Sequence, residues 1–375
     1  MMVFVGKREG ALAAAQRLGV DVVLVVERPL RRPPPVVRAV IEHAFTSDDW
    51  RGVARRVRSF GDIEGVLALT ESAVPAAAGL REELALQGLR PAQALACTDK
   101  TAMKRTVAAA GLRCAQYLSA AEALNAEEIV ARLGLPLVLK PACSSGGRGT
   151  RRIDAPEDLP STLPDGYMAE TFIDGVEMSV ESLVSDGAPV FVNVTEYFEP
   201  RWANLLPARL PDARRNALLE LNREAIRALG IERGITHVEA FLTPTGFVFG
   251  ELAARPPGGH LMELIELVYG FDPWECCIAL ERERPIAPAA LAQCFAGVRV
   301  LHPGAGTITC ISGLEHIEAL PELARFVCRA EVGDLIPERL GTGQEIGYVI
   351  FTAPRREDVA TALDAARRLL RFELR

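Results

Sequence analysis

A lysine and a glycine-rich loop, set between two strand-like segments, restrict the fold of this 375-residue chain more than any other feature. Leu137–Leu139 is a short apolar run that reads as a buried strand and delivers Lys140 at its end. Three glycines follow between positions 146 and 149, and residues 151–153 form a second strand candidate. Glycines at this density let backbone N–H groups approach phosphate oxygens, although a flexible hairpin tip is the alternative interpretation.

The order of these residues excludes one familiar phosphate-binding loop. The lysine precedes the glycines, and no G-x-x-x-x-G-K-[ST] string follows, so this is not a Walker loop that feeds a helix. We expect instead a strand–loop–strand flap with a cation at its base, which closes over a triphosphate. This expectation requires the rest of a nucleotide site elsewhere in the chain.

Residues 1–95 alternate between strand and helix signals, which indicates a small parallel sheet with helices on its faces. Gly6 and Gly10 follow the first strand without G-x-G-x-x-G spacing, so a dinucleotide site is only weakly indicated. Glu71 comes directly after the strand candidate 66–69, at the edge where open α/β sheets place ligand-facing residues. The alternative role for Glu71 is that of a first-turn acid in the next helix.

Lys100 lies in the first turn of a helix that we expect to begin at its cap, Thr98 or Asp99, and to end at Gly111. A cation at this position opposes the helix dipole, and this small misfit favours a ligand role for Lys100. The tripeptide 102–104 is similar to a biotin attachment sequence, but a lysine inside a helix is the wrong context for one.

Two carboxylates share one face of a later strand. Residues 167–184 predict a strand, a bend at Asp174-Gly175 and an alternating strand that carries Glu177 and Glu181. Carboxylates on one face of a strand often face solvent, so we favour solvent exposure for Glu177 and Glu181.

Residues 193–211 are predicted to form a long loop that covers a substrate, because Arg201 and Trp202 lie there among prolines.

A second hairpin places two further glutamates within reach of one cation. Strands at 236–241 and 247–255 are joined by a turn at 243–246, so that Glu239 and Glu251 face each other. Glutamate is disfavoured in strands, and an unpaired buried carboxylate is costly. A hard metal ion is the economical partner for the two side chains.

Bulk properties exclude several classes of function. The net charge of −7 argues against a protein that coats nucleic acid or an anionic membrane. The eight cysteines form no C-x-x-C motif, which favours scattered thiols in a reducing cytoplasm, and the five histidines show no metal-binding spacing. The N-terminus reads as a strand and not as a signal peptide, and no apolar run near it could span a bilayer. We expect a soluble cytoplasmic protein without a nucleic-acid or membrane partner.

Taken together, Asp99-Lys100, the Lys140 flap, Glu170 with Glu177, and Glu239 with Glu251-x-x-x-Arg255 resemble the ATP-grasp superfamily. The resemblance implies an α/β protein with the ATP-grasp fold: an N-terminal βαβ (pre-ATP-grasp) domain, a mobile α+β lid and a C-terminal α+β domain. The expected divisions are 1–95, 96–290 with the lid at about 112–172, and 291–375. The last segment is also a candidate dimer surface.

The resemblance implies ATP and Mg²⁺, with Mn²⁺ as an alternative ion, and a role for each site residue. Lys100 and Lys140 would hold the α- and β-phosphates, Glu239 and Glu251 the metal. Arg255 would hold the substrate carboxylate and, with Lys140, act in catalysis. The other nucleotide-binding candidates are Val138, Ser144, Ser145, Gly146, Gly147, Gly149, Glu170, Ile173, Glu177 and Phe241. The other substrate-pocket candidates are Glu71, Arg201, Trp202, Gly258, Gly259 and His260.

The activity implied is that of a carboxylate–amine ligase, in which ATP converts a carboxylate to an acyl phosphate that an amine attacks. Ala253 replaces an asparagine that many members carry, so the sequence looks more like the L-amino-acid ligase branch than the biotin carboxylase branch. The alternatives are a purine-pathway or biotin-carboxylase-like enzyme and a non-catalytic ATP-binding regulator. His237 is expected to be a hydrogen-bonded strand histidine without a functional role.

Overall fold

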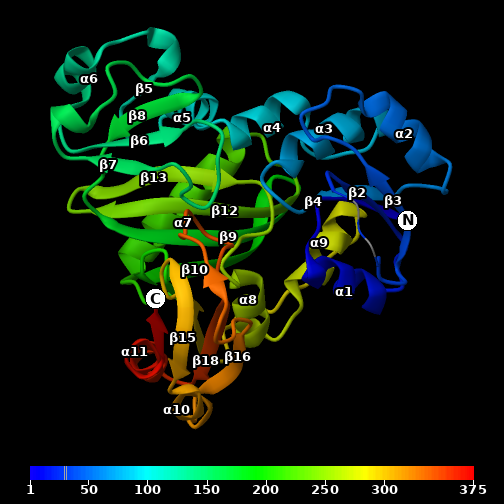
Figure 1. The fold of residues 1–375 in the computed structure, drawn as a ribbon. Helices are drawn as coiled ribbons and strands as arrows, with labels where there is room; N and C mark the ends of the chain where they lie inside the picture. The colour runs from blue at the N-terminus through cyan, green and yellow to red at the C-terminus, as the bar shows by residue number, and fades with distance from the viewer. Residues whose placement is uncertain (29, 31) are drawn as a thin grey trace.

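The structure is a computed structural model that describes residues 1–28, 30 and 32–375. Figure 1 shows the N-terminal sheet at the right, the lid that carries the glycine loop at the upper left, and below the lid a large antiparallel sheet that runs into the C-terminal part. Within the described residues, no helix is long and apolar enough to cross a bilayer.

The N-terminal part is a parallel four-stranded sheet in the order β3-β2-β1-β4. Its strands are β1 (Met2–Val5), β2 (Val22–Val26), β3 (Val37–Glu42) and β4 (Gly65–Ala68). Its helices are α1 (Glu9–Arg17), α2 (Trp50–Arg58), α3 (Ala73–Leu84) and α4 (Pro91–Thr98). Every residue of β1 and β2 is buried, as expected when helices cover both faces of a parallel sheet. The predicted βαβ alternation is confirmed, although β3 and α4 were not predicted.

The lid follows α5 (Lys100–Ala109) and is a four-stranded sheet in the order β5-β8-β6-β7. Its strands are β5 (Tyr117–Ser119), β6 (Leu137–Pro141), β7 (Arg151–Ile153) and β8 (Tyr167–Thr171). The helix α6 (Ala126–Leu133) and the short 3₁₀ turns η1 (Ala120–Glu122) and η2 (Pro156–Asp158) complete it. The buried side chains of α6, β6 and β8 form a cluster of their own, which includes Ile129, Leu137 and Ala169. A separate core suits a unit that moves as one body.

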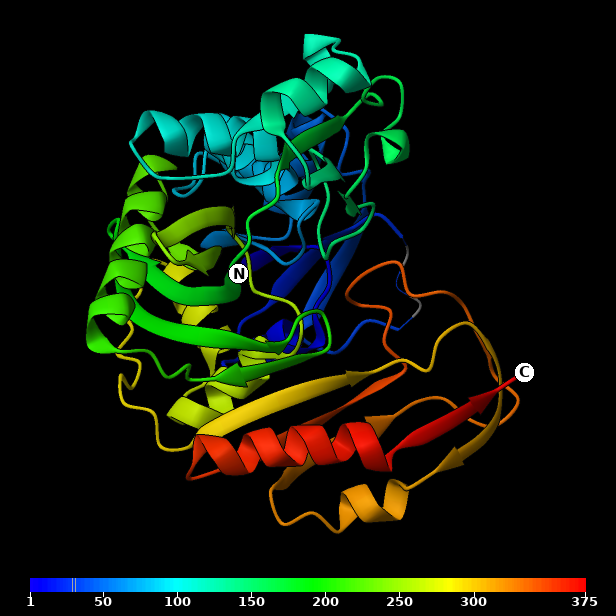
Figure 2. The same ribbon diagram turned by 90° about the vertical axis from the view of Figure 1, so that its left-hand side faces the viewer.

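The large sheet is antiparallel, in the order β13-β12-β9-β10-β11-β14-β18-β16. Its strands are β9 (Val176–Ser185), β10 (Ala188–Glu199), β11 (Ala203–Leu206), β12 (Gly234–Thr243), β13 (Gly246–Ala253), β14 (Phe295–Leu301), β16 (Leu323–Cys328) and β18 (Gly347–Ala353). Its helices are α7 (Asp212–Ala228), α8 (Leu261–Tyr269), α9 (Pro273–Glu281) and α11 (Arg356–Leu369). Figure 2 shows α11 along the strand β14, against which it packs.

The C-terminal part adds the helix α10 (Leu314–Glu318) and a small sheet in the order β17-β15-β19. The strands of this sheet are β15 (Gly306–Ser312), β17 (Leu335–Ile336) and β19 (Arg371–Leu374). The helix α11 ends at Leu369, and the last residues of the chain form the strand β19.

One expected loop is wrong. Residues 193–211 do not form a long covering loop, because most of them belong to the antiparallel pair β10 and β11. Pro200 lies in the turn between the two strands and Pro207 directly follows β11, so these prolines mark strand ends, where a missing N–H is tolerated. Arg201 and Trp202 consequently lie at a tight turn.

Candidate functional site

Lys100 connects three parts of the chain. Asp99 caps α5 by accepting hydrogen bonds from the N–H groups of Thr101 and Ala102 at 2.8 and 3.0 Å, which fixes the helix start as predicted. The ammonium group of Lys100 donates to the carbonyl of Ser144 in the glycine loop at 2.7 Å. It also pairs with Glu251 on β13 at 3.3 Å. Lys100 is only 7% exposed, so its charge is held between the loop and the central sheet.

Lys140 and a second lysine share one buried carboxylate. Lys140 Nζ donates to Glu170 Oε1 at 2.5 Å, and Lys104 pairs with Glu170 Oε2 at 2.9 Å. Burial opposes ionisation of Glu170, but the charges of both lysines lower its pKa. Burial also disfavours the charged form of Lys140, but Glu170 and Glu251 raise its pKa, so Lys140 stays a cation.

Lys104 was missed as a site residue because it was weighed only as a biotin attachment site. Its position four residues after Lys100 on the same helix was the available signal, because residues at that spacing share a helix face. The pairing also bears on the role predicted for Glu170. Its carboxylate is engaged by the two lysines, so a contact with adenine through that side chain would have to compete with them.

The other nucleotide-binding candidates lie on strands that join the lid to the central sheet. Val138 on β6 pairs with Glu170 on β8, and Ile173 follows the end of β8. Glu177 on β9 pairs with Phe241 on β12. The two pairs therefore border the connection between the two sheets.

The glycine loop, residues 144–149, connects β6 and β7 and takes the conformation that its glycines permit. Gly146, Gly147 and Gly149 have φ values of +65°, +70° and +73°, in the left-handed region that favours glycine. The carbonyl of Gly146 accepts a hydrogen bond of 3.0 Å from the N–H of Thr342, which belongs to the segment 337–345 of the C-terminal part. The tip of the loop is thereby joined to a segment almost 200 residues away.

Glu239 and Glu251 are directly paired across β12 and β13, as the hairpin predicts. Nearby, burial and then the charges of Glu239 and Glu251 raise the pKa of Glu177 to about 8. The three carboxylates thus form a region of excess negative charge.

Glu239 belongs to a buried network of hydrogen-bonded polar side chains. His237 contacts Glu181 through Nδ1 at 2.9 Å and Glu239 through Nε2 at 3.3 Å, while Tyr197 donates to Glu239 at 3.0 Å. Burial disfavours a charged His237, but the bonds to Glu181 and Glu239 raise its pKa to about 10. His237 is hydrogen-bonded, as predicted, but it also contacts a proposed metal ligand.

The expectation that Glu181 faces solvent is wrong. Its side chain is fully buried and accepts hydrogen bonds from Ser179, Asn193 and Thr195 at 2.7, 2.6 and 2.7 Å. Those neighbours, together with His237, satisfy the charge that burial would otherwise disfavour. These partners lie on the adjacent strands β10 and β12 and on β9 itself, and Tyr269 of α8 donates to Asn193 at 3.0 Å beside them, neighbours that alternation along one strand does not reveal.

The oxygen atoms of Glu239 and Glu251 suit a hard cation. Among the described residues, no group of three His, Cys, Asp or Glu side chains forms a complete metal site. Mg²⁺ binds in proteins through one or two carboxylates plus substrate phosphates, so a pair of glutamates fits this ion without a third protein ligand. The raised pKa of Glu177 fits the same interpretation, because a cation would offset the local negative charge.

Arg255 and Glu71 form an ion pair of 2.8 Å at the junction of the N-terminal and central parts. Arg255 also donates to the carbonyl of Pro256 at 2.9 Å. Burial raises the pKa of Glu71, although Arg255 opposes the shift. Glu71 therefore lies after β4, as the sequence indicated, and contacts Arg255, the arginine that we expect to bind substrate.

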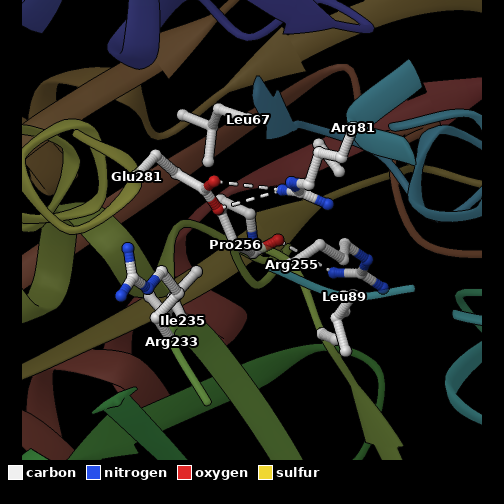
Figure 3. Close-up of a pocket in the computed structure, with 11 residues that line it drawn as sticks. Leu67, Arg81, Leu89, Arg233, Ile235, Arg255, Pro256 and Glu281 are labelled. Atoms are coloured by element: carbon white, nitrogen blue, oxygen red, sulfur yellow. Dashed lines mark hydrogen bonds and ion pairs between the residues drawn. The ribbon is translucent and has the colours of Figure 1, made fainter. Parts of the chain in front are cut away.

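Arg255 is one of the residues that line a small cavity between β4, α3, α9 and the central sheet (Figure 3). Arg81 Nη2 donates to both oxygens of Glu281 there, at 3.0 and 3.1 Å, and both residues are buried. This ion pair joins α3 to α9 in the cavity that Arg255 also lines.

Four of the five remaining substrate candidates lie against residues of the C-terminal part. Arg339 stacks over the ring of Trp202 at 4.3 Å and donates to the carbonyl of Arg201 at 2.8 Å. His260 stacks on Tyr348 at 3.7 Å between ring centres. Gly258 lies beside Thr342, and Gly259 beside Asn204. Among the described residues, no hydrogen bond or ion pair joins Arg201 or Trp202 to Glu71 or Arg255.

Comparison with known families gives two matches. Residues 105–262 match the ATP-grasp domain, and residues 299–375 match the L-amino acid ligase C-terminal domain 2. Together the two matches cover most of the chain.

Individual relatives and solved structures show the same pattern. The L-arginine-specific L-amino acid ligase of Bacillus subtilis is 24% identical over 344 residues, which are 85% of this chain and 83% of the relative. The L-amino acid ligase of Bacillus licheniformis superposes with a TM-score of 0.83 at 21% identity, covering 100% of this chain and 98% of that one. The N5-carboxyaminoimidazole ribonucleotide synthetase of Thermotoga maritima gives 0.79 at 19%, covering 100% and 99%. The two superpositions show a shared fold.

Proposed function

Because residues 105–262 match the ATP-grasp domain and residues 299–375 match the L-amino acid ligase C-terminal domain 2, we propose that the chain is an ATP-dependent carboxylate–amine ligase. Its substrates in this proposal are an amino acid or similar small carboxylic acid and an amine. The observation that carries it is the ion pair of Lys100 with Glu251, which joins a lysine that we propose binds phosphate to one of the two opposed glutamates.

The proposed roles follow from charge. Lys100 and Lys140 neutralise phosphate oxygens, and the N–H groups of the glycine loop surround them. Glu239 and Glu251 would hold Mg²⁺, which neutralises charge on the transferred phosphoryl group when bound. Positioning and electrostatic stabilisation supply most of the catalysis in phosphoryl transfer, so this set of residues matches the requirement.

The chemistry proceeds in two balanced steps. A carboxylate oxygen attacks the γ-phosphorus of ATP, the bond to the bridging oxygen breaks, and ADP leaves with its electron pair. The amine nitrogen then attacks the acyl phosphate carbon, phosphate departs, and the nitrogen loses a proton. Arg255 balances the negative charge of the carboxylate before the first step and of the phosphate in the second.

We also propose the division of the chain into domains, its location and its dimer surface. The divisions 1–95, 96–290 and 291–375 are supported by the separate N-terminal sheet and lid core. A cytoplasmic location is supported by the eight free cysteines, which suit a reducing compartment. The C-terminal part remains the candidate dimer surface.

The test is a screen of ADP release over pairs of carboxylates and amines. The proposal expects release that requires both partners, and a loss of about 10²-fold or more in turnover for Lys140→Ala, in line with the removal of comparable electrostatic groups. ADP formation with bicarbonate alone would favour a carboxylase instead. ATP binding without turnover for any pair would favour a regulator.

A further inference from the structure

Two guanidinium groups from distant parts of the chain converge on one carbonyl oxygen. Arg8 lies three residues after the end of β1 and directly precedes α1, whereas Arg255 lies two residues after the end of β13. Arg8 Nη2 donates to the carbonyl of Pro256 at 3.3 Å, and Arg255 Nη1 donates to the same oxygen at 2.9 Å. Arg8 also donates to the carbonyl of Pro257 at 2.8 Å. Two positive side chains therefore lie side by side at the junction where Glu71 is placed.

The two arginines differ in how their charge is balanced. Arg255 has a carboxylate partner in Glu71 at 2.8 Å. Within the described part of the chain, Arg8 contacts no carboxylate: it bonds to the two carbonyls and lies over the ring of Trp274 at 6.0 Å. Its Nε is buried and has no hydrogen-bond partner. Burial and then the charge of Arg255 lower the pKa of Arg8 to about 10.

This arrangement is unfavourable unless an anion completes it. Like charges repel strongly where water is partly excluded, and a buried donor without a partner costs free energy. A guanidinium group presents its donors in a planar fork that matches a carboxylate. The position also suits a ligand, because Arg8 and Glu71 follow β1 and β4 at the carboxyl edge of a parallel sheet.

We propose that Arg8 binds a second substrate carboxylate, one that is not activated in the reaction, beside the activated carboxylate that Arg255 holds, and so determines specificity for an amino acid as the amine-bearing substrate. The inference rests on the proposed ligase function and deepens it. In this role Arg8 requires that the attacking amine carry a free carboxylate, so that a simple amine or an amino acid amide binds poorly.

The experiment compares free L-amino acids with their carboxamides as the amine-bearing substrate, at saturating ATP. Arg8→Met is expected to raise KM for the free amino acid about 10- to 100-fold, as for the loss of a hydrogen bond between charged groups, and to leave KM for the carboxamide unchanged. Arg8→Lys is expected to lie between, because lysine keeps the charge without the fork. A change in kcat or in KM for ATP of the same size with both substrates would overturn the proposal and point to a phosphate contact.

Arg17→Met is the matched control. Arg17 is also on the N-terminal part, and it also reaches the core, through ion pairs with Asp272 and with Glu275, the latter at 2.9 Å. It is not part of the site. If Arg8 only fastened the N-terminal part to the Pro256–Pro257 turn, Arg8→Met would lower the melting temperature as Arg17→Met does, and would affect acid and amide equally.

A binding measurement separates this inference from the proposed reaction. The melting temperature of the protein with MgADP is recorded against each of the twenty L-amino acids and its carboxamide. An increase caused by a free amino acid, absent with its amide and lost in Arg8→Met, supports the carboxylate site even if no pair releases ADP. No difference between acid and amide in the unmodified protein would overturn it.

Discussion

Glu239 and Glu251 stand directly opposite each other on the antiparallel strands β12 and β13. Like charges in directly opposed positions destabilise a sheet, so each glutamate needs a compensating group. Lys100 compensates Glu251, and His237 with Tyr197 compensates Glu239. Burial and then the charges of these two carboxylates raise the pKa of the neighbouring Glu177 to about 8.

Neutralising one member of this pair is expected to abolish turnover without unfolding the protein. Glu251→Gln should lower ADP formation about 10²-fold or more, by analogy with the removal of other preorganised electrostatic groups. The control is Glu220→Gln, because Glu220 lies exposed on α7 in a surface pair with Arg223 at 2.8 Å. Steady-state ADP release measures both. Equal rates for the two variants would contradict the metal assignment.

Lys104 is expected to act on stability. Lys104→Met removes a buried cation and leaves Glu170 with Lys140 alone, and breaking a buried pair costs about 3–5 kcal/mol. Lys7→Met is the control, because Lys7 is exposed and pairs with the exposed Glu9 at 2.6 Å. Urea unfolding measures the difference between them. A Lys104→Met protein as stable as Lys7→Met would show that the pair has no structural role.

The stability of the nucleotide-free protein is expected to fall with rising pH because of Glu177. Its pKa rises from 4.5 to about 8 on folding, so the folded state binds the proton more tightly than the unfolded chain. The contribution of this proton is therefore full below about pH 4.5 and is lost between pH 4.5 and 8. Urea unfolding from pH 5 to 8 should show a steeper decline for the unmodified protein than for Glu177→Gln. The exposed Glu157→Gln should follow the unmodified protein, and a parallel course for all three would contradict this prediction.

The hydrogen bond between Thr342 and Gly146 is expected to help close the glycine loop over ATP. Thr342→Pro removes the N–H donor, whereas Thr342→Ala keeps it. A net hydrogen-bond contribution of about 0.5–1.5 kcal/mol corresponds to an increase in KM for ATP of roughly 2- to 10-fold in the proline variant alone. KM for ATP is measured from initial rates at varied ATP concentration. Identical KM values for the two variants would show that this hydrogen bond does not help to close the loop.

The sequence was most informative where a residue's role depends on its own strand or helix. The cap at Asp99, the opposed glutamates and the glycine loop all follow from local spacing. The contacts that could not be predicted are those between residues on different strands and helices. Glu181 finds hydrogen-bond partners on β10 and β12, which flank β9, and Arg8 meets Arg255 because the N-terminal sheet packs near the end of β13. Neither neighbour relation is encoded in a local pattern.

The strand pair β11–β14 also has a practical consequence for anyone who shortens this protein. The large sheet passes through this pair without a break, so a fragment that stops at residue 290 would leave the outer side of β11 with unpaired backbone groups. Such an open border recruits strands from other molecules. Expression of the first 290 residues alone should therefore yield aggregates, even though the proposed nucleotide residues all lie within that fragment.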